Sequence, residues 1–265
     1  MGTFQGHVLP AAFFIGFSAL FLCHTLYQAY HLPPGACLSD HVLDRKPSQF
    51  RKIAIFGLVA TVIGILYEGL NGLFDISGDH GSNFFANITH EVLYIAFSFV
   101  TMIMIMESNR RVPQNSTRLA LCVAFLVEYI LWYGHALMKY GANLKVHVLL
   151  AQTCLVSSVV FLVAATYPKS VTAYVAGLCL MLLQGTWLIQ AGINELDGHD
   201  LNMHQVDSFF CLHILAIAFV VSIATACVYT DTTGEGDILR AEKGGEQYEQ
   251  VTVCTAVESE DEESA

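Results

Sequence analysis

The chain reads as seven long apolar stretches separated by shorter polar segments. Each stretch holds about twenty or more residues, the length that a helix needs to cross roughly 30 Å of hydrocarbon. The stretches cover residues 9–30, 53–74, 86–106, 118–138, 144–166, 171–192 and 206–229. Lipid offers a bare backbone no hydrogen-bond partner, so each stretch is expected to be helical. The pattern predicts an all-α, polytopic membrane protein whose residues 1–230 form a seven-transmembrane-helix bundle.

Composition agrees with this class and adds a separate C-terminal segment. The chain is 54% hydrophobic and 13% charged, values that soluble globular domains seldom combine. Its net charge is −11, and residues 258–263 near the C-terminus are mostly acidic. Such a segment has too few apolar residues to build a core, so residues 231–265 are predicted to form a disordered acidic tail. No basic patch is present, which argues against a nucleic-acid partner.

The positive residues predict the orientation, because Lys and Arg collect in cytosolic loops. Most of them follow the first, third, fifth and seventh stretches. They are Arg45, Lys46, Arg51, Lys52, Arg110, Arg111, Arg118, Lys169, Arg240 and Lys243. Lys139 and Lys145 fall on the other side. We therefore expect the N-terminus outside and the C-terminal tail in the cytosol.

A small set of ionisable residues lies within the apolar stretches. Inside a bilayer each costs a few kcal/mol, so those that remain are expected to have partners or a role. They are Glu68, His90, Glu91, Glu128, His135, His147 and His213. In the predicted topology all lie between the midplane and the outer surface. Glu128 and His135 are two helical turns apart and share one face of their helix. Four amides are expected to extend this polar network: Gln152, Gln184, Gln190 and Asn194.

Imidazoles at similar depth on several helices suit a metal ion. Zinc takes three or four His, Asp or Glu ligands at about 2.0 to 2.2 Å. The candidate ligands for zinc or another transition metal are His90, His135, His147 and His213. Glu128 or Glu68 would be a further ligand or would orient a ligand imidazole. Tyr94 stands where a metalloprotease HExxH helix needs its second His, so that motif is absent and no catalytic residue is assigned.

Other histidines have a simpler interpretation, because interfacial His is readily satisfied by water or headgroups. We expect this of the histidines at or beyond the outer surface, which are His7, His80, His199 and His204. Trp132 and Tyr133 are expected to belong to an interfacial aromatic belt rather than to a ligand cage. Asn87 opens a glycosylation sequon close to a helix start. No outer-loop cysteine is expected, which argues against a disulfide framework.

The tail carries one short motif. Tyr248 and Val251 have the Tyr-x-x-apolar spacing that endocytic adaptors read. Together with the acidic run, the motif indicates cytosolic protein partners.

Several segments together resemble the transmembrane protein 45 family almost from end to end. They are MGTFQGHVLP, VEYILWYGHALMKYGANLKVHVLL, QGTWLIQAG, and His204 with the run from Phe210 to His213. The resemblance implies a multi-pass protein of the plasma membrane or of endosomal and Golgi membranes, with no settled biochemical activity. Relatives usually carry a further His at the position of Leu137. They also carry an Asp near the position of Asn143. If those two groups bind a ligand in the relatives, this chain would bind it more weakly or in a different way.

Three functions remain open at this point. The first is a non-enzymatic protein in membrane trafficking or signalling, with the histidines as a network that titrates near pH 6.5. The second is an intramembrane metal site for metal handling or metal-assisted hydrolysis. The third is haem between axial histidines, which the one-sided cluster disfavours.

Overall fold

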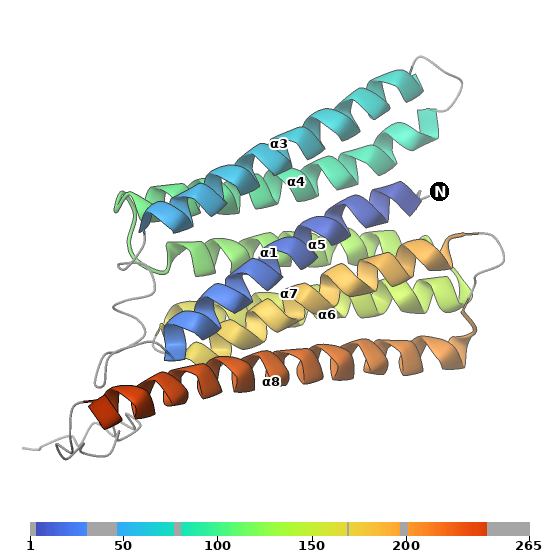
Figure 1. Cartoon of the computed structure of the whole chain (residues 1–265). Coiled ribbons are helices and arrows are strands. Elements are labelled where there is room, and N and C mark those ends of the chain that lie inside the picture. The colour runs from blue at the N-terminus through green and yellow to red at the C-terminus, as the bar shows by residue number, and fades with distance from the viewer. Residues whose placement is uncertain (1–3, 31–46, 77–80, 169, 197–200, 243–265) are drawn as a thin grey trace, which may run out of the picture.

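The computed structural model describes residues 4–30, 47–76, 81–168, 170–196 and 201–242. The regular secondary structure of these residues is entirely α-helical (Figure 1). The helices are α1 (Phe4–Tyr30), α3 (Pro47–Ile76), α4 (Gly81–Ser108), α5 (Ser116–Ala136), α6 (Gly141–Thr166), α7 (Val171–Asn194) and α8 (Met203–Glu242).

Each of these helices contains a segment long and apolar enough to cross a membrane. The segments are Gly6–Ala29, Phe50–Leu70, His90–Ser108, Ser116–Ala136, Gly141–Thr166, Val171–Asn194 and Met203–Tyr229. Every one overlaps a stretch predicted from the sequence. Over the described residues, the predicted all-α fold with seven candidate membrane spans is confirmed.

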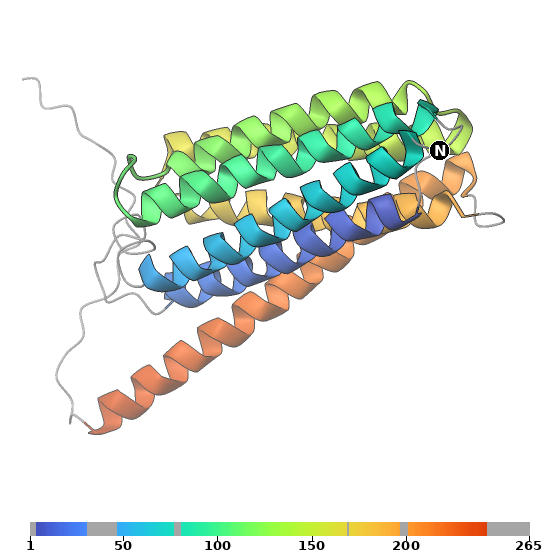
Figure 2. The ribbon, with the colours of Figure 1, turned by 90° about the horizontal axis from the view of Figure 1, so that it is seen from above.

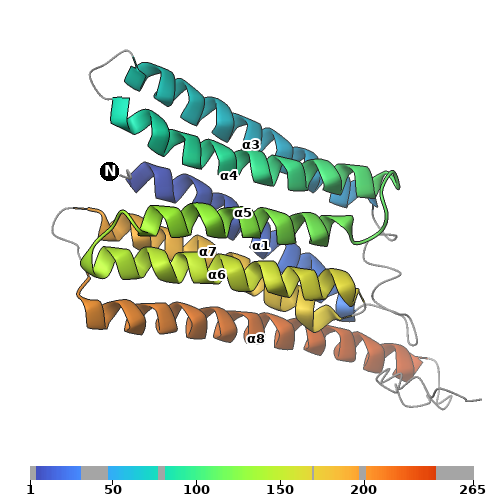
Figure 3. The ribbon, with the colours of Figure 1, turned by 180° about the vertical axis from the view of Figure 1, so that it is seen from behind.

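The helices pack in pairs along the bundle. α3 lies along α4, α5 along α6, and α1 along α7, while α4 joins the first pair to α5. From behind, α4, α5, α6 and α8 follow one another across the bundle (Figure 3). From above, α8 runs along the outside of the other helices and diverges from them (Figure 2). The closely packed centre therefore lies among α1, α4, α5, α6 and α7.

Four phenylalanines from four helices form the middle of the core. The ring centroids of Phe14 and Phe97 are 4.9 Å apart, and those of Phe97 and Phe125 are 5.5 Å apart. Phe125 stacks on Phe161 at 5.5 Å with their planes 4° apart. Lipid is as apolar as these side chains, so close packing rather than exclusion from water holds such helices together.

The bundle end where α4 ends and α5 begins is fixed by two charged side chains. Glu107 accepts a 2.7 Å hydrogen bond from the backbone N–H of Thr117, and so supplies a cap to α5 from the neighbouring helix. Arg118 donates to the carbonyls of Ala164 and Pro168, at 2.9 and 3.0 Å. The Ala164 carbonyl is among those left free at the C-terminal end of α6, and Pro168 lies just beyond that end.

Helix α8 is the most exposed of the seven. Among its described side chains, Val206 and Ile217 are the buried ones. The helix continues to Glu242, so residues 231–242 are helical where the sequence predicts the start of a disordered tail. A formed helix adds residues at low cost, which explains this extension. Residues 243–265, with Tyr248 and Val251, lie outside the described residues, as do His80 and His199.

Candidate functional site

Two histidines and a carboxylate meet at the bundle end where α1 begins. His7 comes from the first turns of α1, His147 from the first turns of α6, and Glu195 is the C-cap residue of α7. Because α1 and α6 begin at this end and α7 stops there, residues distant in sequence come together (Figure 1). His7 is 1% exposed, His147 is fully buried, and the Glu195 side chain is 8% exposed.

The three side chains lie close enough to share one ion. His7 Nδ1 is 3.8 Å from Glu195 Oε2, and His147 Nε2 is 3.8 Å from Glu195 Oε1. One ligand atom from each residue lies within 4.8 Å of the others. Two imidazole nitrogens and a carboxylate oxygen form a donor set that zinc and similar ions accept. We name these three residues the His–Glu cluster.

The imidazole of His147 is oriented by the backbone of its own helix. Its Nδ1 lies 2.8 Å from the carbonyl oxygen of Asn143, one turn earlier. A ring nitrogen so close to a carbonyl carries the proton, which leaves the lone pair on Nε2. That Nε2 atom is buried and has no hydrogen-bond partner among the described residues. Metal-binding histidines commonly show this arrangement, in which one nitrogen is held by a carbonyl and the other is free to bind.

Glu195 has its charge balanced from the loop between α5 and α6. Its Oε1 lies 2.5 Å from Lys139 Nζ, whereas its buried Oε2 accepts no hydrogen bond among the described residues. A carboxylate at a helix C-terminus is unfavourable because that end carries partial negative charge. Lys139 offsets this cost and holds the carboxylate toward the histidines.

His135 and Trp132 form one wall of the cluster. The His135 ring is 5.1 Å from that of His147, and its buried Nε2 has no hydrogen-bond partner among the described residues. Trp132 is 1% exposed and lies 5.9 Å from the ring of His7. The prediction that Trp132 belongs to an interfacial belt is therefore wrong. Tyr133, next in the chain, is 46% exposed, as such a belt requires.

Polar groups continue from the cluster toward the middle of the bundle. Trp132 Nε1 donates a 3.1 Å hydrogen bond to Glu128 Oε1, one turn deeper on α5. Glu128 and Gln184 are both fully buried. The second Glu128 oxygen and both amide atoms of Gln184 have no geometric hydrogen bond within the described part of the chain. Gln152, expected in the same network, is exposed instead.

Two of the histidines predicted as ligands lie elsewhere. His90 Nδ1 is 3.5 Å from Glu68 Oε1, so this pair joins α4 to α3. His213 packs edge-on against Trp187, with ring centroids 5.5 Å apart. Of the four predicted imidazoles, His135 and His147 are the two in ring contact. The described residues give no test of metal binding by the predicted set, so that binding stays a prediction.

The sequence interpretation missed His7 and Glu195. His7 was expected at the surface, and the structure buries it. One available signal was spacing, because His7 shares a helix face with Ala11, Phe14 and Ser18, all of them buried. For Glu195 the sequence offers only an acidic residue directly after an apolar stretch. His204, also expected at the surface, is exposed.

One family comparison bears on this region. Residues 114–194 match a protein family of unknown function, DUF716. The matched segment comprises α5, α6 and α7, so it contains His135 and His147 and ends one residue before Glu195. It covers less than half of the chain, and His7 lies outside it. This family includes transmembrane protein 45-type proteins, which agrees in part with the resemblance found in the sequence.

Proposed function

We propose that this multi-pass membrane protein binds one transition-metal ion of the zinc class in the His–Glu cluster and serves metal handling rather than catalysis. One observation carries the proposal: His147 holds its proton toward Asn143 and presents a buried free nitrogen to Glu195 and His7. Uncompensated polar atoms inside a membrane protein are costly, so a bound cation would supply the missing partner.

The distances suit such an ion after a small adjustment. Tetrahedral ligands at about 2.05 Å from zinc lie roughly 3.3 Å from one another. His7 Nδ1 and Glu195 Oε2 are 3.8 Å apart and would need to approach by about half an ångström. His147 Nε2, now 3.8 Å from Oε1, would have to turn toward Oε2. Glu195 can bind through Oε2 while Lys139 keeps Oε1.

A fourth ligand is available beside the cluster. A rotation of His135 would bring its free Nε2 toward His147 and close the coordination sphere. Four protein ligands leave no position for a substrate or an activated water, which is the usual distinction between structural and catalytic zinc sites. This arrangement favours metal handling over metal-assisted hydrolysis.

Metal content of the purified protein tests the proposal. In detergent, after equilibration with zinc and removal of excess, the wild type should retain about one ion per chain. His147→Ala and Glu195→Gln should each lose it, because each removes a ligand. His204→Ala is the matched control, since His204 is exposed at the start of α8 and outside the cluster. Metal-free wild type, or equal retention by all variants with unchanged melting temperatures, would overturn the proposal.

A second role is compatible with the first and rests on the tail. We propose that Tyr248 and Val251, with the acidic run after them, recruit cytosolic proteins that direct trafficking or signalling at the plasma membrane or at endosomal and Golgi membranes. The support is the spacing of the motif in the sequence. Adaptor proteins are cytosolic, so a C-terminus accessible from outside intact cells would exclude this role.

A further inference from the structure

A separate apolar groove lies between α1 and the α3–α4 pair, away from the His–Glu cluster. Its volume is about 370 Å³. Leu9, Gly16 and Leu20 line it from α1, Phe56 and Ile63 from α3, and Tyr94 from α4. Four of these side chains are between 43% and 64% exposed: Leu9, Leu20, Phe56 and Ile63. The groove therefore opens on the lipid-facing surface. Small-molecule sites typically span about 300 to 1,000 Å³.

The groove is bounded at one point by the side chain of Phe17, which reaches from α1 to α3. At that point, a Cβ on Gly57 would lie 2.9 Å from Cζ of Phe17. Beyond it, a Cβ on Gly16 would meet nothing within 4 Å. The absence of a side chain at Gly16 therefore contributes to the opening.

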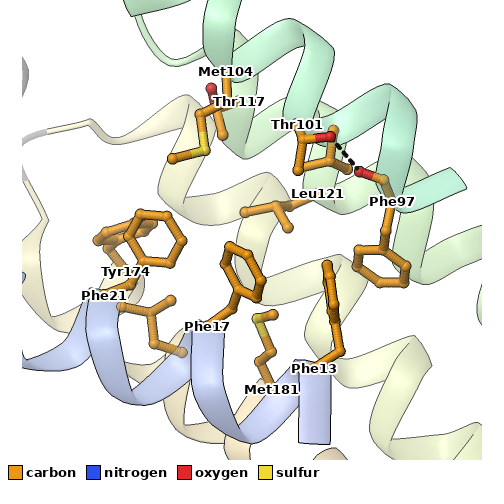
Figure 4. A pocket seen from close by; sticks show the side chains of 12 residues that line it. Phe13, Phe17, Phe21, Phe97, Thr101, Met104, Thr117, Leu121, Tyr174 and Met181 are labelled. Carbon is orange, nitrogen blue, oxygen red and sulfur yellow. Dashed lines mark hydrogen bonds between the residues drawn. The ribbon is translucent and has the colours of Figure 1, made fainter. Parts of the chain in front are cut away.

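Aromatic rings of α1 form the floor of the groove. Phe13 and Phe17, with ring centroids 4.4 Å apart, line the groove on one side and an inner cavity on the other. Figure 4 shows this cavity, into which Phe13, Phe17 and Phe21 project from α1 opposite Leu121. Its volume is about 30 Å³, far smaller than the 370 Å³ of the groove. A lipid would therefore stay in the groove.

One end of the groove is polar. Tyr94 is 7% exposed, and its hydroxyl is buried with no hydrogen-bond partner among the described residues. Its ring lies against Gly64, where a Cβ would be only 2.6 Å from it. One turn further along the two helices stands the Glu68–His90 pair. Among the described residues, no Lys or Arg lines the groove, and the nearby carboxylates would repel a phosphate headgroup.

We infer that this groove binds a sterol-type lipid, with its flat apolar body on Phe13 and Phe17 and its single hydroxyl hydrogen-bonded to Tyr94. From Leu9 to Leu20 the groove is about 17 Å long at 1.5 Å per residue. This is close to half of a hydrocarbon core of roughly 30 Å, so the lipid occupies one leaflet. An uncharged hydroxyl headgroup matches an end that offers one free hydroxyl and no cation. The inference is independent of metal binding.

Photo-crosslinking with a diazirine sterol in phosphatidylcholine vesicles tests the inference. Wild type should be labelled on peptides of α1, α3 or α4, and excess unlabelled sterol should compete. Gly16→Leu places a side chain in the groove at a position where an added Cβ meets nothing within 4 Å, and it should reduce labelling about tenfold or more. Gly134→Leu is the matched control, because a Cβ there also meets nothing within 4 Å. Tyr94→Phe should reduce labelling roughly two- to tenfold through loss of one hydrogen bond.

Any one of three other results would overturn the inference. Undiminished labelling of Gly16→Leu would place the sterol outside the groove. Equal labelling of wild type by a diazirine phosphatidylcholine, with competition by excess phosphatidylcholine, would show a surface that takes any acyl chain. Unchanged labelling of Tyr94→Phe would remove the hydroxyl contact that selects the headgroup.

Discussion

At the scale of single residues, the surroundings of each buried imidazole distinguish the histidines from one another. His147 has one nitrogen held by a carbonyl and the other directed at a carboxylate. His90 lies beside the carboxylate of Glu68 on the neighbouring helix, and His213 has an aromatic ring beside it. Only the first environment combines a fixed tautomer with several converging donors, which is what a metal ion needs.

This difference predicts which histidine substitutions affect metal binding. His7→Ala should lower zinc affinity by about 100-fold or more, because even groups that only orient a ligand are worth 10- to 100-fold. His90→Ala and His213→Ala should leave the affinity within about threefold, since neither imidazole belongs to the His–Glu cluster. Competition with a fluorescent zinc chelator measures all three. Loss of affinity on replacing His90 or His213, with His7→Ala unaffected, would restore the ligand set predicted from the sequence.

Sequence reasoning located part of this site for a physical reason. His135 and His147 stand out because an imidazole deep in an apolar stretch is costly. His7 does not stand out, because it lies near the end of its stretch where water is a normal partner. Its burial arises from tertiary packing against Trp132 and His147. Contacts of this kind depend on which helices meet, and one sequence does not show that.

At the scale of helices, glycines set how closely neighbours approach. A Cβ on Gly185 of α7 would lie 3.0 Å from the backbone nitrogen of Ile15 and 3.0 Å from Cβ of Phe14. Backbone atoms cannot rotate away, so α1 and α7 touch here only because residue 185 lacks a side chain. Small residues at such contacts are a general means of holding membrane helices together.

Two alanine substitutions separate this contact from helix propensity. Gly185→Ala should destabilise the bundle by about 1 to 3 kcal/mol, since α1 must move outward. Gly134→Ala adds its methyl group to open space and should be neutral or stabilising by up to about 1 kcal/mol. The apparent melting temperature in one detergent compares them. Equal melting temperatures for the two variants would contradict a tight α1–α7 contact.

The sequence predicted the helices well and their faces poorly. A run of some twenty apolar residues is a strong signal, and the structure has a spanning helix at each such run. A side chain that faces lipid and one that faces a neighbouring helix are equally apolar, so the pattern carries little information about pairing. Gln152 illustrates the limit: it was expected to face inward as an amide, and it is exposed.

At the scale of the whole molecule, ion pairs sharpen the charge asymmetry along the bundle axis. The two lysines at the end that holds the His–Glu cluster are both paired. Lys139 lies 2.5 Å from Glu195, and Lys145 lies 2.5 Å from Asp207. Their positive charge is locally balanced. The opposite end carries Arg51, Lys52, Arg110 and Arg111, which is the excess expected of a cytosolic face.

This asymmetry predicts the orientation of the chain, and with it the side from which a metal ion would reach the cluster. Because His7 lies in the first turns of α1, an outer start of α1 places the cluster at the outer face. A short epitope tag before Met1 should be labelled by antibody on intact cells, whereas a tag after Ala265 should require permeabilisation. The reverse pattern would place the cluster toward the cytosol, expose the Tyr248 motif outside, and exclude a role for that motif in adaptor binding.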